Sequence, residues 1–416
     1  MKEIALVLAT IITIYYAVFI NYKKGFNIFL IFLAFSSLIG YSRAILSPAI
    51  VLPISMILGI FLQKKELNNL NYWGFFLFLY SILITLINKT EIFDDRTLGS
   101  TFLAFFLLMI SPYLFNDRNN FLRVLLLIWA ICLGSLIFYL INGTDVTSVS
   151  NVQSRGIYVE LRQASADPNY VGIIMGVGLL LSVMYLLNIK TIALEFNIKS
   201  YRVINYFVIA VGVLEFWLCI RGLSLGILIA LSASILALLI KGKKIKIFFI
   251  VATLISIFII FFNDVVQLYI LRFDTVSTTG SGRYEVWATA WKAISKEGFF
   301  RVLFGGGASS PWWKHAMGIS YFSTHNSFLT LLIDYGIIGV SMFLIIFFKS
   351  LYINFKDDSF IGKSRFVLII FMLVVAFSLE PLAITMDALI FSVVLSYNKI
   401  PSKRKEITIY TTNKLQ

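Results

Sequence analysis

The sequence predicts an all-α protein: a polytopic transmembrane helix bundle of 12–13 spans, with a large extracytoplasmic loop that contains amphipathic helices. Composition is the first reason. Of the 416 residues, 59% are hydrophobic and only 13% are charged, against about 25% charged residues in an average soluble domain. Mean hydropathy is +0.89. This composition excludes a soluble enzyme, a disordered protein and a protein with a single membrane anchor.

Continuous apolar runs are the second reason, because the strands of a membrane β-barrel would alternate instead. Some runs are short and could tilt or re-enter the membrane. The first run lacks a basic leader and a small-residue cleavage site, so we expect a retained helix and not a cleaved signal peptide. The runs cover residues 4–20, 26–40, 44–62, 72–87, 100–115, 121–142, 169–188, 204–220, 222–240, 247–263, 327–348, 366–379 and 382–397.

The distribution of charge predicts the orientation of the bundle. The net charge is +14, but one set of loops, with the C-terminal tail, carries 22 Lys and Arg residues against six acidic ones, and the opposite loops carry 13 of each. Short cytoplasmic loops are enriched in Lys and Arg. We therefore expect a cytoplasmic C-terminus and two outer loops, 143–168 and 264–326. The basic excess indicates topology and not a nucleic-acid-binding surface.

This topology divides the chain into three regions. Residues 1–142 form N-terminal transmembrane helices, residues 143–400 a transmembrane region that includes both outer loops, and residues 401–416 a cytoplasmic basic tail. The two cysteines, Cys132 and Cys219, lie in apolar runs, which predicts neither a disulfide framework nor a metal motif.

The long outer loop has a pattern of its own. Between Arg283 and Lys296, an apolar face with Trp287 and Trp291 repeats at helical spacing, which predicts a helix. Such a face suits a helix lying in the headgroup region, although the helix could merely cap the bundle. The following Gly305–Gly307 triplet is expected to break regular structure.

Two histidines and two arginines are expected in the outer loops or at the outer ends of spans, and three of these four residues are candidates for chemistry there. His325 comes directly before a span, whereas His315 lies beside tryptophans and is typical of an interface anchor. Arg221 lies between two apolar runs with almost no loop, so its guanidinium could either snorkel to headgroups or bind a phosphate bidentately. Arg283 begins the predicted helix, where the helix dipole disfavours a cation, and this hints at an anionic partner.

Two acids, Glu215 and Asp334, lie within predicted spans. Intramembrane acids are functional candidates by default, and these two also suit a transporter.

Motifs for soluble activated substrates are missing: the sequence has no P-loop, no dinucleotide-type glycine pattern and no spaced D-x-D pair. We therefore expect no metal ion and no cofactor. A synthetic reaction on the outer face would need a substrate activated in advance, such as a lipid-linked diphosphate.

Several motifs resemble those of one family in the same order. His325-Asn326, nine further residues and Gly336-Ile337-Ile338-Gly339 resemble the signature of the O-antigen ligase and polymerase superfamily (Wzy/WaaL-type). Ser281-Gly282-Arg283 with Trp287 resembles the start of its large periplasmic loop, and the glycine triplet resembles its glycine turn. Arg221-Gly222 resembles its arginine at the outer end of a span, with Ile220 where serine is usual. Asp167-Pro168-Asn169 resembles its entry to an earlier span.

The resemblance implies a GT-C-like, metal-independent, inverting glycosyltransferase. Arg221 and Arg283 would hold a substrate diphosphate, and His325 would act as general base, since an unperturbed imidazole titrates near neutral pH. Asn326 would orient His325 or simply cap the next helix. Weaker candidates for the same cavity are Arg155, Arg162, Asn169 and Glu380.

The implied substrate is an undecaprenyl-diphosphate-linked oligosaccharide, handled at the periplasmic or external face of the bacterial cytoplasmic membrane. Implied partners are membrane lipids, a chain-length regulator and a flippase, and no nucleic acid. The resemblance alone leaves open a polymerase, which joins lipid-linked repeat units, and a ligase, which transfers glycan to lipid A-core. We favour the polymerase, because it also occurs where no lipid A exists and because a composition rich in Ile, Lys, Asn and Phe hints at an AT-rich genome. A transporter that uses Glu215 and Asp334 is the alternative from another class.

Overall fold

The computed structural model describes most of the predicted helices. The described residues are 2–38, 46–63, 71–88, 95–115, 117–142, 168–195, 201–222, 224–242, 283–308, 324–379 and 385–396, with a few loop residues at 144–145, 157–158, 160–161, 164–165, 267 and 270.

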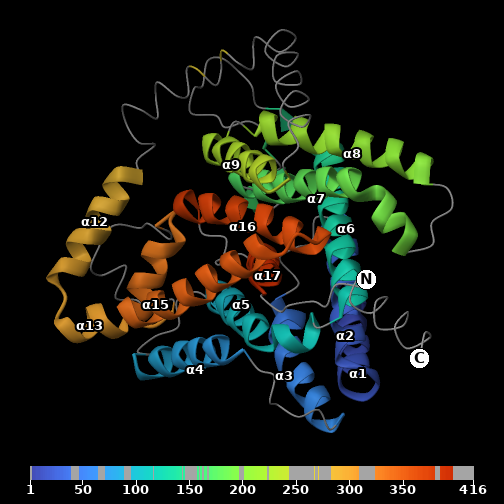
Figure 1. The fold of residues 1–416 in the computed structure, drawn as a ribbon. Coiled ribbons are helices and arrows are strands. Elements are labelled where there is room, and N and C mark those ends of the chain that lie inside the picture. Colours follow the sequence, from blue (N-terminus) through green and yellow to red (C-terminus); the bar gives the residue numbers. More distant parts are fainter. Residues whose placement is uncertain are drawn as a thin grey trace, which may run out of the picture.

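Helices make up nearly all of this part of the chain (Figure 1). Four two-residue strands pair within the loop 143–168, β1 (Thr144–Asp145) with β2 (Ile157–Tyr158) and β3 (Glu160–Leu161) with β4 (Ala164–Ser165). The helices are α1 (Lys2–Tyr15), the π-helical η1 (Tyr16–Ile20), α2 (Tyr22–Leu38), α3 (Leu46–Leu62), α4 (Tyr72–Ile87), α5 (Asp95–Leu114), α6 (Arg118–Asn142), α7 (Pro168–Glu195), α8 (Tyr201–Arg221), α9 (Leu225–Gly242), α12 (Arg283–Lys296), α13 (Phe299–Phe304), α15 (Ser327–Lys356), α16 (Phe360–Ser378) and α17 (Thr385–Leu395).

The predicted all-α, polytopic class is confirmed. Twelve of the thirteen predicted runs coincide with helices, and the run 247–263 lies outside the described residues. Among the described residues, five helices are long and apolar enough to cross a membrane, in α6, α7, α8, α15 and α16, and five shorter apolar helices accompany them. The total of 12–13 spans stays a prediction.

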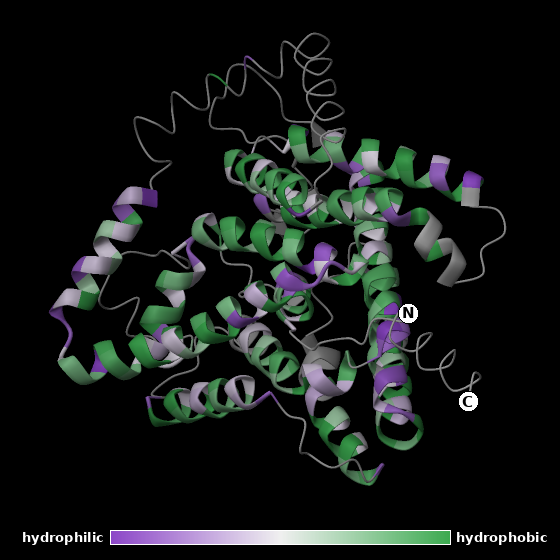
Figure 2. Ribbon diagram, in the orientation of Figure 1, coloured by the Kyte–Doolittle hydropathy of each residue, from purple (hydrophilic) through white to green (hydrophobic). Residues whose placement is uncertain are grey.

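The outer surface of the helices supports a membrane location. Large apolar side chains are exposed on many helices, for example Phe19 (68%), Tyr206 (74%) and Ile141 (75%). Figure 2 shows apolar residues around most of the helices and polar residues mainly on α12 and near helix ends. A helix that is apolar on all sides either lies in a protein core or spans a membrane, and these exposed faces have no protein beside them.

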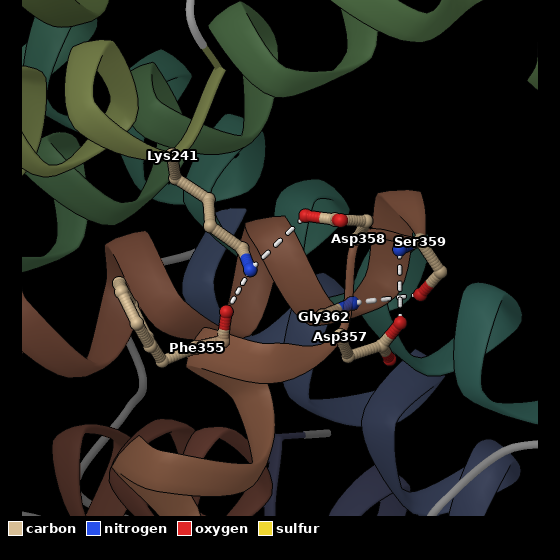
Figure 3. Close-up of polar contacts among 6 residues, drawn as sticks. All are labelled: Lys241, Phe355, Asp357, Asp358, Ser359 and Gly362. Atoms are coloured by element: carbon tan, nitrogen blue, oxygen red, sulfur yellow. Dashed lines mark hydrogen bonds and ion pairs between the residues drawn. The ribbon is translucent and has the colours of Figure 1, made fainter.

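One end of the bundle is fixed by charged and capping side chains between α9, α15 and α16 (Figure 3). Lys241, at the end of α9, donates to the Phe355 carbonyl and lies 3.2 Å from an Asp358 carboxylate oxygen. Ser359 caps α16 by accepting from the Gly362 amide at 3.1 Å. The end of α9 therefore meets the α15–α16 connection here.

The opposite end brings together the start of α9 and the end of α16. A Cβ at Gly226 would lie 2.7 Å from the Ser378 hydroxyl, so the two backbones approach closely. The 18 residues of α9 separate the two ends by about 27 Å at about 1.5 Å per residue, close to the thickness of a hydrocarbon core.

Some residues assigned to the basic loops lie in helices instead. Lys349 and Lys356 belong to α15, which extends further than the predicted span, and Arg365 belongs to α16. Arg365 is 1% exposed, and its guanidinium carbon lies 3.8 Å from the centre of the Phe121 ring. The loop prediction was wrong for Arg365 because counting charges cannot separate a solvated loop cation from one that packs on an aromatic face.

Candidate active site

His325 lies in a turn of unusual backbone conformation, formed by residues 324–327 and called here the histidine turn. Its φ is +53°, and it is the one non-glycine residue with positive φ in the described part of the chain. A left-handed conformation costs a residue with a Cβ about 1–2 kcal/mol. Such strain persists only where neighbouring contacts determine the backbone, and it clusters at functional sites.

Asn326 acts as the cap of α15. Its side-chain oxygen accepts from the amides of Phe328 and Leu329, each at 3.0 Å. Capping, one of the two roles that the sequence allowed for Asn326, is therefore present in the structure. The Thr324 hydroxyl closes the other side of the turn, because it accepts from the Asn326 amide at 3.0 Å and contacts the Thr330 hydroxyl at 2.8 Å.

The end of α16 holds the same turn from a second side. The Asn326 side-chain amide donates to the Phe377 carbonyl at 3.2 Å, and the Ser327 amide donates to the Leu379 carbonyl at 3.2 Å. The Phe328 and Phe377 rings pack with their centres 4.8 Å apart. The histidine turn is thus fixed to the end of the bundle where α9 meets Ser378.

The predicted outer-loop helix is confirmed as α12, with the bounds Arg283–Lys296. It lies with α13 at one edge of the bundle beside α15 (Figure 1), and its buried face of Val286, Ala290, Ala293 and Ile294 packs against Leu329 and Ile333.

The two tryptophans of the predicted face have different environments. The Trp287 indole donates to the Thr324 carbonyl at 2.9 Å, whereas Trp291 is 57% exposed. Arg283 is one turn before Trp287, so the two residues share a face of α12. This spacing brings Arg283 to the side of α12 that faces the histidine turn.

The glycine triplet forms the second contact between the loop and α15. The Gly306 amide donates to the Ile333 carbonyl at 2.9 Å, and the Gly307 amide donates to the Asp334 carbonyl at 2.8 Å. Both carbonyls are available because α15 is interrupted at Gly336, whose φ of 63° and ψ of −170° are not helical. The loop therefore supplies the hydrogen bonds that the interrupted helix lacks.

The interruption changes the prediction for α15. The predicted span 327–348 lies within α15, but the helix is interrupted at Gly336, so that residues 327–335 form a short first segment. Asp334, expected in the middle of a span, lies two residues before the interruption and is 9% exposed. The segment 337–356 is 20 residues long, or about 30 Å, which alone is enough to cross a bilayer.

Tyr80 of α4 joins both sides of this contact. Its hydroxyl lies 2.8 Å from the Phe304 carbonyl and 3.1 Å from the Tyr335 carbonyl. One turn later on α4, the Thr85 hydroxyl accepts from the Ala308 amide at 3.1 Å. Sequence reasoning missed Tyr80 and Thr85, because neither belongs to a motif and nothing local indicates a partner more than 200 residues away.

Arg221 ends α8 at the same end of the bundle. Its guanidinium carbon lies 4.6 Å from the centre of the Trp217 ring, one turn earlier on the same helix. Five residues later, Gly226 packs on Ser378, next to the residues that hold the histidine turn. Arg221 is the last residue of α8, Arg283 is the first residue of α12, and His325 lies two residues before the start of α15.

Asn169 also belongs to this end. It follows Pro168, the first residue of α7, and is 5% exposed. The thiol of Cys219, two residues before Arg221, lies 3.8 Å from the Gly172 carbonyl in the first turn of α7. The other predicted candidates, Arg155, Arg162 and Glu380, and the interface residue His315, lie outside the described residues.

The intramembrane acid Glu215 takes part in hydrogen bonds that join three helices. It is 0% exposed, and one carboxylate oxygen accepts from the Ser182 hydroxyl at 3.0 Å. That hydroxyl in turn accepts from the Trp129 indole at 2.8 Å. This chain of contacts ties α6, α7 and α8 together inside the bundle, away from Arg221.

A second buried acid was missed by the sequence analysis. Asp387 in α17 is 0% exposed, and neither of its carboxylate oxygens has a hydrogen-bond partner among the described residues. The signal was present, because a single acid within an apolar run is expensive and therefore informative.

The comparison with known proteins agrees with the motifs. Residues 206–344 match a protein-family model described as O-antigen ligase. The matched range contains Arg221, Arg283, His325 and the interruption at Gly336. No curated protein matches the chain. Residues 206–344 are therefore similar to the O-antigen ligase family.

Proposed function

We propose that the protein is a bacterial surface-polysaccharide polymerase. It transfers glycan from undecaprenyl diphosphate to an acceptor hydroxyl of another lipid-linked repeat unit, on the outer face of the cytoplasmic membrane. The observation that supports the proposal is that Arg221, Arg283 and the strained His325 each lie at the terminus of a helix in an apolar bundle, within the range that matches the family model. Lys241 lies at the other end, paired with Asp358, and a basic residue there is expected if that end faces the cytoplasm.

The chemistry follows from the three side chains. His325 accepts the proton of the acceptor hydroxyl as its oxygen forms a bond to the anomeric carbon of the donor. The bond from that carbon to the diphosphate oxygen breaks, and the diphosphate leaves with the electron pair. Two guanidinium groups stabilise the charge that develops on this leaving group, so the reaction needs no metal ion. Attack opposite the leaving group inverts the configuration at the anomeric carbon.

Reconstitution tests this function directly. The purified protein in liposomes receives an undecaprenyl-diphosphate repeat unit, and the product is resolved on a gel. A ladder of increasing length without lipid A-core supports the polymerase. Product that forms only after addition of lipid A-core identifies a ligase instead, which is the activity that the description of the family model names. Absence of glycan transfer to either acceptor contradicts both.

Arg221→Ala is expected to lower the rate of chain growth by roughly 10²- to 10³-fold. Loss of the guanidinium leaves the departing diphosphate without a charge-assisted, bidentate partner. Arg221→Lys should restore only part of the rate, because an ammonium group cannot form the bidentate contact. The measurement is the initial rate in the reconstituted assay. Arg202→Ala, at the opposite end of the same helix, is the matched control, and equal losses in both variants would argue against the role.

Glu215→Gln separates this proposal from transport. The hydrogen bond to Ser182 (3.0 Å) can be kept by a glutamine oxygen, so we expect chain growth within about twofold of the wild type. A transporter that uses this carboxylate would lose its activity on the same change while tolerating His325→Ala. Rates of polymer formation for the two variants, measured side by side, decide between these classes.

A further inference from the structure

The peptide plane before His325 carries the strain of the histidine turn. The Thr324 carbonyl belongs to the same peptide unit as the His325 amide, so the orientation of that plane sets the φ of His325, which is +53°. Relaxation to negative φ would rotate this plane about the N–Cα bond. Any partner of the Thr324 carbonyl therefore opposes relaxation.

That partner is the indole of Trp287, which donates to the Thr324 carbonyl at 2.9 Å. Other hydrogen bonds of the turn lie within the turn and α15, as for the Thr324 hydroxyl and the Asn326 cap, or go to the end of α16, as for Ser327 and Leu379. Trp287 is the contact from the outer-loop helix, and it acts on the peptide before His325.

The position of Trp287 is itself well determined. Its neighbours Val286 and Ala290 are 4% and 0% exposed, and they pack against Leu329 and Ile333 in the first segment of α15. The indole donor and the histidine turn therefore both belong to the packed pair formed by α12 and the first segment of α15. A shift of α12 would move the hydrogen-bond donor and the imidazole together.

We propose that Trp287 is a positioning residue for His325: its indole N–H, bonded to the Thr324 carbonyl, holds the histidine backbone in the left-handed conformation that aims the imidazole at the acceptor hydroxyl. The proposal rests on the proposed function for its effect on rate. Its structural part concerns only the environment of the His325 imidazole and can be measured without turnover.

The test removes the N–H and keeps the ring. Trp287→Phe and incorporation of benzothienylalanine at position 287, which replaces the indole N–H with sulfur at nearly unchanged shape, are compared with Trp291→Phe. Trp291 lies on the same helix but is 57% exposed, which makes it the matched control. All variants carry His315→Gln, which leaves His325 as the one histidine of a chain that has two, so its imidazole gives a single set of NMR signals.

We expect both changes at position 287 to shift the His325 imidazole resonances and to lower kcat by about tenfold to a hundredfold, as for a small misplacement of a reacting group. The KM for the lipid-linked donor should stay within about twofold, because the arginines that hold it are unchanged. Trp291→Phe should leave the resonances, kcat and KM as in the parent.

Unchanged His325 resonances in the benzothienylalanine protein would overturn the proposal, and so would equal shifts in the Trp291 control. A fall in kcat without any shift of the resonances would overturn it as well. If His325→Ala still makes polymer, the proposed function fails, yet the NMR comparison still decides whether Trp287 sets the environment of His325.

Discussion

Replacing His325 with asparagine is expected to lower the rate of chain growth by about 10²- to 10⁴-fold, the usual contribution of a general base. Asparagine tolerates the left-handed conformation better than most residues with a Cβ, so the turn, at φ +53°, should persist. The amide side chain cannot take a proton from the acceptor hydroxyl. Single lipid-linked repeat units should therefore accumulate in the reconstituted assay.

Asparagine is a sharper test than alanine at this position. His325→Ala removes the base and also places a residue that disfavours positive φ in the turn, so its defect mixes chemistry with backbone strain. Equal losses for the two variants indicate that the imidazole is what matters. A milder defect in the asparagine variant would assign part of the alanine effect to the turn.

The second histidine of the chain offers the control. His315 belongs to the same predicted outer loop, beside two tryptophans in the sequence, and the proposal gives it no part in the reaction. His315→Ala should give a ladder of normal length and rate. A normal ladder from His325→Asn would contradict the role of His325 as base, whatever the result for His315.

Local sequence patterns predicted the elements of the site well. The helix 283–296 followed from apolar spacing, and the start of α7 followed from the apolar run that begins at residue 169. The place of His325 directly before a helix followed from the change between polar and apolar residues. Each of these features depends on residues within a few positions of one another, and the structure has them where they were expected.

Contacts between distant segments were not predictable in the same way. The apolar run after His325 is continuous, so hydropathy gives no sign of the interruption at Gly336. The pairing of Gly306 and Gly307 with α15 uses backbone groups, which every residue carries, and so leaves no pattern of side chains. The contacts of Tyr80 and Arg365 become apparent only when the helices are placed together.

The glycines at the interruption of α15 should be the least replaceable residues of the outer region. Gly336 has φ 63° and ψ −170°, and Gly305 has φ 86° and ψ 177°. Both pairs of angles fall in a region that is nearly restricted to glycine. A Cβ at Gly336 would lie 2.4 Å from the Leu303 carbonyl oxygen, and a Cβ at Gly305 would lie 2.4 Å from the Asp334 carbonyl oxygen.

We expect Gly336→Ala and Gly305→Ala each to destabilise the protein by about 3 kcal/mol or more, since backbone strain and a clash with backbone atoms add together. Gly298→Ala is the matched control on the same loop, because a Cβ there meets nothing within 4 Å. The measurement is the midpoint of thermal unfolding in detergent, together with the rate of chain growth. Unchanged midpoints in the Gly336 and Gly305 variants would contradict the pairing of the loop with α15.

The same variants should also stop the reaction, although neither glycine touches a reacting atom in the proposed mechanism. The Gly306 and Gly307 amides satisfy the carbonyls of Ile333 and Asp334, so a displaced triplet leaves two carbonyls of α15 without these partners. The first segment of α15 starts at the cap of Asn326, next to His325, and packs on α12, which carries Arg283 and Trp287. Loss of the interruption would allow α15 to straighten into a continuous helix. Because His325 and the helix that carries Arg283 both depend on that short segment, a single added methyl group would displace both residues.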